Sequence, residues 1–151
     1  MDFFTELFAN ELFKSTFWAW FICQILKTLI NLRLNHTLDL ERMIGSGGMP
    51  SAHSAAVTSF ATTAGFLYGP SSFEFIISLL YAIIVMYDAR GVRLETGNQA
   101  KVLNHLIKLL SDKEHIIPFD QKLQELVGHT PLQVLVGSLL GFIISICFFY
   151  Y

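Results

Sequence analysis

The chain has 151 residues, of which 53% are hydrophobic, 14% are aromatic and only 15% are charged, and its formal net charge is −2. Soluble domains carry about 25% charged residues, so the composition excludes an ordinary soluble domain and indicates one membrane-embedded domain over residues 1–151. The slightly negative charge and the lack of a basic arm argue against nucleic-acid binding.

The N-terminal segment is predicted to be an amphipathic lead-in to the first apolar run. Asp2, Glu6 and Glu11 stand where a secretory signal peptide has positive charge, so no cleaved signal is expected. The two cysteines, Cys23 and Cys147, lie inside apolar runs and lack the spacing of zinc ligands.

Four apolar segments predict the fold. A helix needs about 20 apolar residues to cross the hydrocarbon core of a bilayer, and the last segment meets this requirement without a charged residue. The others are short or contain charge, so we expect all four to pack together. They comprise residues 16–34, 51–68, 73–87 and 132–151, with a tight turn at 69–72. The prediction is an all-α integral membrane bundle of about four transmembrane helices.

A fifth helix is predicted in the polar stretch between the third and fourth segments. Its apolar residues recur at helical spacing, so we expect an amphipathic helix on the membrane surface or on the bundle. These residues are Val102, Leu103, Leu106, Ile107, Leu109 and Leu110.

Charge asymmetry predicts the orientation. Eight of the ten Lys and Arg residues lie from Arg33 onward, in the loops after the first and third segments. By the positive-inside rule these loops face the cytoplasm, most simply across a plasma (inner) membrane. Three polar stretches, 45–54, 87–104 and 125–134, then meet at one membrane face.

The first of these stretches, GSGGMPSAHS, is a candidate anion site. Gly48 and the glycines before it allow positive φ and close approach to a ligand. Pro50 suits the first turn of a helix, whose N-terminus would present Ser51, His53 and free N–H groups to an anion. The alternative is a glycine-rich loop with a capping serine and an incidental histidine.

The second stretch, YDARGVRLETG, places Asp88, Arg90, Arg93 and Glu95 directly after an apolar segment. Arginine can clamp a phosphate with its planar fork of donors. The alternative is positive-inside anchoring with local salt bridges to the two acidic residues.

His129 and Lys27 are two further candidates. His129 precedes the last apolar segment, and histidine can act as a nucleophile or a base near neutral pH; the alternative is a helix-end histidine at the lipid interface. Lys27 lies within the first apolar segment, so it either snorkels to the interface or meets a partner such as a phosphate.

The motifs GGMPSAHSAAV, DARGVRLETGNQAKVLN and ELVGHTPLQVLVG, in this order, resemble those of the divergent branch of the type-2 phosphatidic acid phosphatase (PAP2) superfamily. The resemblance covers nearly the whole chain. It implies a helical membrane phosphatase that needs no metal or cofactor. One histidine attacks phosphorus to give a phosphohistidine, and a second protonates the leaving oxygen.

The resemblance assigns roles to individual residues. Residues 50–53, Pro-Ser-Ala-His, match the family's Pro-Ser-Gly-His motif, so His53 is implied as general acid and Ser51 as a phosphate ligand. His129 is implied as the nucleophile. The positive charges that hold the phosphate would come from Arg93, Arg90 and Lys27.

The chain also departs from the family pattern. Gln133 stands where the family has an aspartate that orients the nucleophilic histidine, and Asp88 or Glu125 is a candidate substitute. Lys122 and Leu123 replace a Ser-Arg pair, so the clamping arginine is expected from the second stretch.

Three functions follow from these residues. The first is hydrolysis of a lipid phosphate or pyrophosphate monoester at the cytoplasmic face, with membrane lipid and a phosphorylated lipid as partners. The second is a non-catalytic PAP2-like protein that binds anionic lipid or a partner helix. The third is a metal-dependent hydrolase that uses Asp88, Glu95 and a histidine.

Overall fold

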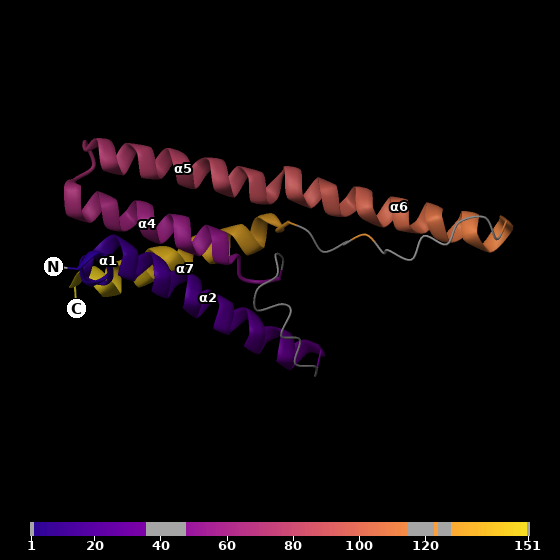
Figure 1. Cartoon of the computed structure of the whole chain (residues 1–151), viewed down its shortest axis with the longest axis horizontal. Coiled ribbons are helices and arrows are strands. Elements are labelled where there is room, and N and C mark those ends of the chain that lie inside the picture. Colours follow the sequence, from indigo (N-terminus) through magenta and orange to yellow (C-terminus); the bar gives the residue numbers. More distant parts are fainter. Residues whose placement is uncertain (1, 36–47, 115–122, 124–127, 151) are drawn as a thin grey trace.

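The computed structural model of the chain describes residues 2–35, 48–114, 123 and 128–150, without the side chains of residues 34, 35, 93 and 111–114. Every regular element in these ranges is a helix, as the sequence predicts (Figure 1). The helices are α1 (Phe3–Ala9), α2 (Glu11–Asn35), α4 (Ala52–Tyr68), α5 (Phe73–Arg90), α6 (Val92–Glu114) and α7 (Pro131–Tyr150).

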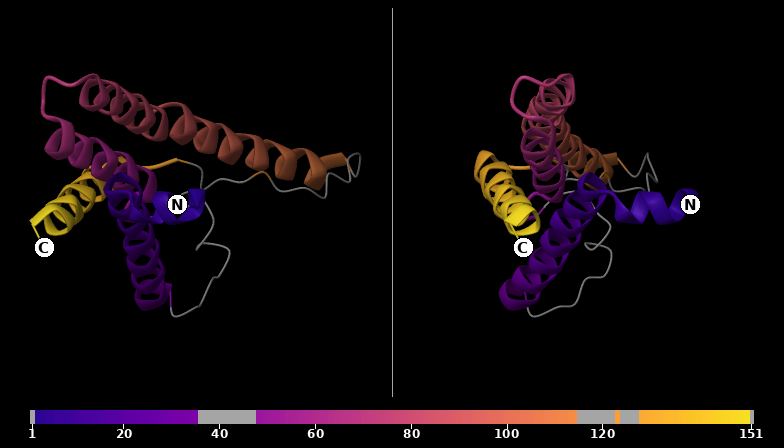
Figure 2. Two further views of the ribbon diagram at one scale, coloured as in Figure 1. Left: turned by 60° about the vertical axis from the view of Figure 1, so that its left-hand side comes forward. Right: turned by 90° about the vertical axis from the view of Figure 1, so that its left-hand side faces the viewer.

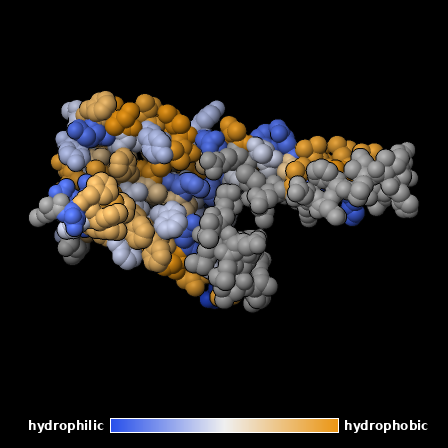
Figure 3. Space-filling model, viewed as in Figure 1, coloured by the Kyte–Doolittle hydropathy of each residue, from blue (hydrophilic) through white to orange (hydrophobic). Residues whose placement is uncertain are grey.

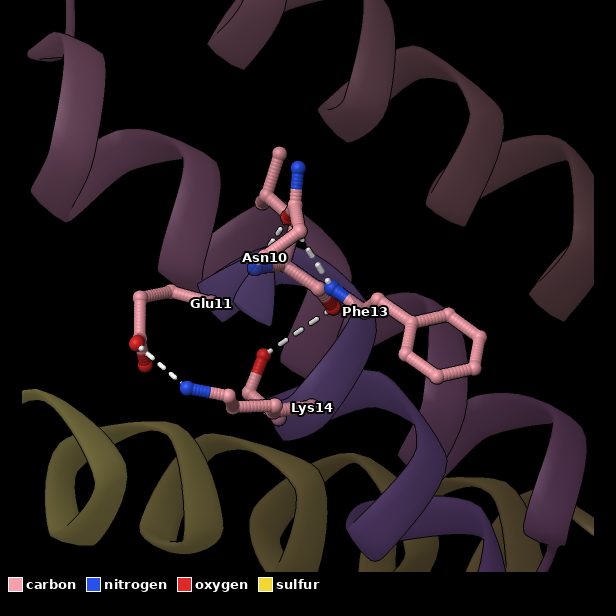
Figure 4. A network of polar contacts seen from close by, with 6 residues as sticks. Asn10, Glu11, Phe13 and Lys14 are labelled. Carbon is pink, nitrogen blue, oxygen red and sulfur yellow. Dashed lines mark hydrogen bonds and ion pairs between the residues drawn. The ribbon is translucent and has the colours of Figure 1, made fainter. Parts of the chain in front are cut away.

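The first apolar helix begins earlier than its apolar run. Asn10 ends α1 and caps α2, because its Oδ1 accepts hydrogen bonds from the backbone N–H groups of Leu12 (2.9 Å) and Phe13 (3.3 Å). An ion pair between Lys14 and Glu11, at 3.0 Å, joins the first turn of α2 (Figure 4). The lead-in is therefore a separate short helix, α1, that leaves the axis of α2 (Figure 2).

The predicted turn between the second and third apolar segments is confirmed. Gly69 has a φ of 88°, which only glycine adopts readily. Ser72 then caps α5: its Oγ accepts from the Phe75 N–H at 3.1 Å and donates to the Gly69 carbonyl at 2.8 Å. Gly65 gives the Phe75 ring room against α4, so α4 and α5 form a close hairpin.

Helix α4 is the centre of the bundle, since it packs against α2, α5 and α7 (Figures 1 and 2). Its contact with the parallel helix α7 is made by small residues at every fourth position. A Cβ on Gly137 or Gly141 would strike the backbone of α4, and Ser145 Oγ lies 2.9 Å from Ser59 Oγ. Such rows let transmembrane helices approach closely. The rows are Gly137, Gly141 and Ser145 on α7, against Ser51, Ala55 and Ser59 on α4.

Helix α6 continues α5 past Gly91 and projects beyond the bundle (Figure 1). Among the described helices it packs only against α5. Near the middle of α6 the Asn104 side-chain amide bonds the backbone N–H (3.0 Å) and carbonyl (2.9 Å) of Leu123. The amphipathic helix is thus present and extends α5 outward, so of its two expected positions the one on the bundle is excluded and the one on the membrane surface stays a prediction.

Large apolar side chains lie mainly on the outside, and small ones fill the interior. Alanine, serine and threonine dominate the buried residues of α4, whereas α2, α5 and α7 expose Phe, Leu, Ile and Trp (Figure 3). Two described stretches, Phe73–Leu110 and Pro131–Tyr150, are long and apolar enough to cross a membrane. The number of four spans stays a prediction.

Candidate active site

The predicted site residues that the structure describes gather at one end of the bundle, where α4 and α7 begin and α5 ends. Two backbone hydrogen bonds join the three helices there. The N–H of His129 donates to the carbonyl of Ala89 in the last turn of α5 (2.9 Å), and the N–H of Ser51 donates to the carbonyl of Gln133 in the first turn of α7 (3.1 Å). The two histidine-bearing segments are therefore held by main-chain contacts.

His129 is oriented by Gln133. The Gln133 Oε1 atom lies 3.3 Å from His129 Nδ1 and also accepts the backbone N–H of Thr130 at 3.0 Å. Because a backbone N–H can only donate, this second bond fixes the amide with its oxygen toward the ring. The acceptor oxygen beside Nδ1 favours the neutral ring that carries its proton on Nδ1.

His53 faces His129 across a short gap. The ring centroids are 6.2 Å apart and the rings are inclined at 57°. His129 is only 2% exposed, whereas His53, in the first turn of α4, is exposed. The site therefore pairs a buried imidazole with one that can exchange protons with water.

Lys27 reaches the same place from α2. Its side chain is 4% exposed, and its aliphatic part packs on Gly48, where a Cβ would lie 3.2 Å from Lys27 Cδ. Gly48 has a φ of 82°, so both its backbone conformation and its lack of a side chain are used. Lys27 is directed into the protein and acts electrostatically on His129.

Ser51 caps α4 and is fully buried. Its Oγ accepts from the Ser54 N–H at 3.3 Å and from the Ser54 hydroxyl at 3.0 Å, so its own hydroxyl hydrogen remains to be donated. Pro50 precedes this cap, and the expectation that it lies in the first helical turn is wrong by two positions, because Ser51 is the cap and α4 begins at Ala52.

Burial lowers the pKa of His129 below its usual value of about 6.5. The nearby charges of His53 and Lys27 lower this pKa further, and hydrogen bonds with Gln133 and the Gly48 backbone oppose the shift. His129 is therefore a neutral base at pH 7.

The other predicted residues lie around this centre or outside the described part. Asp88, half-buried, and Arg90, exposed, flank Ala89 in the last turn of α5. Arg93 lies in the first turn of α6, and its side chain is outside the described part, as is all of Glu125. Within the described ranges no three His, Cys, Asp or Glu residues are placed to hold a metal ion.

Some residues that build the site were not predicted from the sequence. The Ala89 carbonyl, which holds His129, could not be anticipated, because a backbone contact between distant segments leaves no mark on residue type. The small-residue row of α7 does have a signal, the Gly-x-x-x-Gly spacing of Gly137 and Gly141 inside an apolar run.

Comparisons with known proteins agree with these motifs. The sequence matches the Divergent PAP2 family over residues 8–144. It is 34% identical to an uncharacterized membrane protein, YuiD, of Bacillus subtilis (strain 168), over 97% of this chain and 98% of the relative. No solved structure matches the chain. The chain is a helical membrane protein that belongs to the divergent PAP2 family.

Proposed function

We propose that this protein is a metal-independent lipid phosphatase that removes a phosphate from a lipid phosphate or pyrophosphate monoester through a phosphohistidine. The observation that carries the proposal is the arrangement around His129. Its buried ring is held through Nδ1 by Gln133, and the ring centroid lies 6.2 Å from that of His53. The buried Lys27 acts electrostatically on the same ring. The two rings are near enough to each other to act on the same phosphoryl group.

The first step transfers the phosphoryl group to the enzyme. The Nε2 lone pair of His129 attacks phosphorus, a P–N bond forms, and the P–O bond to the lipid breaks on the opposite side. The protonated ring of His53 gives its proton to the leaving oxygen, so that a lipid alcohol departs. With a pyrophosphate the leaving group is the lipid monophosphate.

The second step returns the enzyme to its starting state. His53, now neutral, takes a proton from water while the water oxygen attacks phosphorus. The P–N bond breaks, inorganic phosphate leaves, and His129 regains its lone pair. The exposure of His53 supports this role, since the same ring must meet the lipid oxygen and then water.

Positive charge supports the binding of the phosphate. Lys27 is buried beside Gly48, and α4 directs its N-terminus to the same place. Fixed donors of this kind stabilise the charge on the equatorial oxygens in phosphoryl transfer. Arg90 and Arg93 are proposed to complete the clamp. The distribution of basic residues supports a site on the cytoplasmic side of the plasma (inner) membrane.

The test is phosphate release by the protein purified in detergent, with phosphatidic acid, phosphatidylglycerophosphate and isoprenyl pyrophosphate as substrates. We expect activity that persists in EDTA, is inhibited by vanadate, and is abolished in His129→Ala and His53→Ala. His105→Ala, on the exposed face of α6, is the matched control. Full activity in His129→Ala would exclude the proposed nucleophile, and binding of a lipid phosphate without turnover by the wild type would instead support the non-catalytic alternative.

A further inference from the structure

An apolar cavity of ≈ 510 Å³, open to the outside of the bundle on one side, lies between α1, α2 and α4. It is outside the site described above and is lined almost entirely by carbon. Ligand pockets of about 300–1,000 Å³ are usual for small molecules, so this one accommodates a single hydrocarbon chain. Its lining includes Leu7, Phe13, Phe17, Trp20, Ala56 and Phe60.

The wall formed by α4 leads to the candidate active site. Phe60, Ala56 and His53 are separated by four and three residues, so they lie on one face of the helix. At 1.5 Å per residue, His53 is about 4.5 Å along the axis from Ala56 and about 10 Å from Phe60. The cavity thus begins about one helical turn below the proposed general acid.

The wall formed by α2 leads to the same end. Phe13, Trp20 and Lys27 are each seven residues apart, two turns of a helix, and therefore share a face. Helix α2 runs antiparallel to α4, because Ser15 bonds Thr63 at 2.8 Å near one end and Lys27 packs on Gly48 near the other. On each of the two helices, the residues that line the cavity are therefore followed along the same face by a polar group, Lys27 on α2 and His53 on α4.

The phenylalanine at the start of α2 shows how the cavity is kept apolar. Asn10, which also lines the cavity, directs its side-chain oxygen to the backbone of Leu12 and Phe13, and the Phe13 ring points away from this polar network (Figure 4). The first backbone N–H groups of α2 are thereby satisfied within the chain.

A buried hydrogen-bond acceptor lies on α2 between the aromatic residue Trp20 and the charged residue Lys27. Gln24, one turn from Trp20 and from Lys27, is 7% exposed, and its Oε1 is buried without a hydrogen-bond partner. Buried polar atoms of this kind normally have a partner. The polarity of this face of α2 therefore rises before Lys27 is reached.

We propose that this cavity holds one hydrocarbon chain of the phosphorylated lipid whose phosphate lies between His53 and His129. The inference rests on the proposed function for the position of the phosphate. The occupant is a lipid with phosphate at one end and a saturated or isoprenoid chain at the other, because a basic site and an apolar cavity follow each other along the same two helices.

The kinetic test narrows the cavity with Phe60→Trp, about 10 Å along α4 from His53, and compares hexadecyl phosphate with the soluble substrate butyl phosphate. We expect kcat/KM for hexadecyl phosphate to fall about 10-fold or more, with butyl phosphate unchanged. Ile84→Phe, on the exposed surface of α5, is the control for added bulk. An equal loss for both substrates, or no loss for either, would overturn the proposal.

A binding test on the wild type in lipid nanodiscs does not depend on turnover or on the folding of a variant. An alkyl phosphate with a diazirine at the end of its chain is photolysed, and the adducts are mapped by mass spectrometry. We expect adducts on Phe13, Phe17 and Phe60 that hexadecyl phosphate prevents and phosphatidylcholine does not. Adducts elsewhere, or equal competition by phosphatidylcholine, would reject the cavity. Competed adducts without any hydrolysis would retain the cavity and reject the phosphatase.

Discussion

The Oε1 atom of Gln133 lies 3.3 Å from Nδ1 of His129, and it orients this ring without carrying a charge. The backbone N–H of Thr130 holds the amide in place at 3.0 Å. A carboxylate at this position would orient the ring and also stabilise its protonated form. The amide orients the ring, and although its hydrogen bond raises the pKa of His129, burial outweighs it and lowers that pKa, which fits a histidine that must stay neutral until it attacks.

Removing the Gln133 oxygen should therefore impair catalysis more than binding. In Gln133→Leu we expect kcat for a lipid phosphate to fall about 10²-fold or more, since a histidine held in the wrong tautomer costs a serine-protease triad about 10⁴-fold. Vanadate inhibition should change little. Gln99→Leu, exposed on α6, is the control, and a variant with wild-type kcat would show that the ring needs no such orientation.

Replacing Gln133 with aspartate should change the pH profile. A carboxylate beside Nδ1 favours the imidazolium, so the pKa of His129 should rise. Because the nucleophile must be neutral, the acid limb of kcat/KM should move to higher pH than in the wild type. Steady-state kinetics over pH 4–9 measure this, and an unmoved acid limb would mean that His129 does not titrate on that limb.

The thermal stability of the protein should depend on pH through the protonation of His129. The pKa of His129 is lowered in the folded protein, so the unfolded state binds the proton more tightly. The associated stability is fully present above about pH 6.5 and is lost as the pH falls toward the folded value. We expect the Tm in detergent to fall over this interval in the wild type and to fall less in His129→Asn. Identical slopes in the two proteins would contradict this.

Lys27→Met should weaken phosphate binding without creating a cavity, because methionine keeps most of the aliphatic contact that the lysine makes with Gly48. We expect kcat/KM to fall about 10²-fold, as for the loss of one fixed transition-state donor, and vanadate to bind more weakly. Lys101→Met, on the exposed side of α6, is the matched loss of charge. Equal behaviour of the two variants would reject Lys27 as a phosphate-binding residue.

The contact between α4 and α7 should be intolerant of a single methyl group. A Cβ at Gly141 would strike the Ala55 carbonyl, and overpacking of this kind costs about 1–3 kcal/mol. We expect Gly141→Ala to lower the Tm in detergent, whereas Leu139→Ala, exposed on the same helix, should not. A Gly141→Ala protein as stable as the wild type would show that the helices can separate at little cost.

The helices and the approach of the three motifs to one another could be predicted from the sequence. The hydrogen-bond partners and the helix caps could not. The composition of residues 69–72 predicts a turn, and the structure has one there. The motifs that contain His53 and His129 were predicted to meet, and the two rings are neighbours. The start of α2 was placed too late, because hydropathy does not register the cap at Asn10. The direction of α6 follows from how the chain passes Gly91, which periodicity does not encode. The role of Gln133 depends on which atom faces the ring, and only the fold decides that.

The parallel packing of α4 and α7 has an electrical consequence. Each helix carries about half an elementary positive charge at its N-terminus, and both termini lie at the histidines. The main chain alone therefore offers an anion about one unit of positive charge, which no side-chain substitution removes.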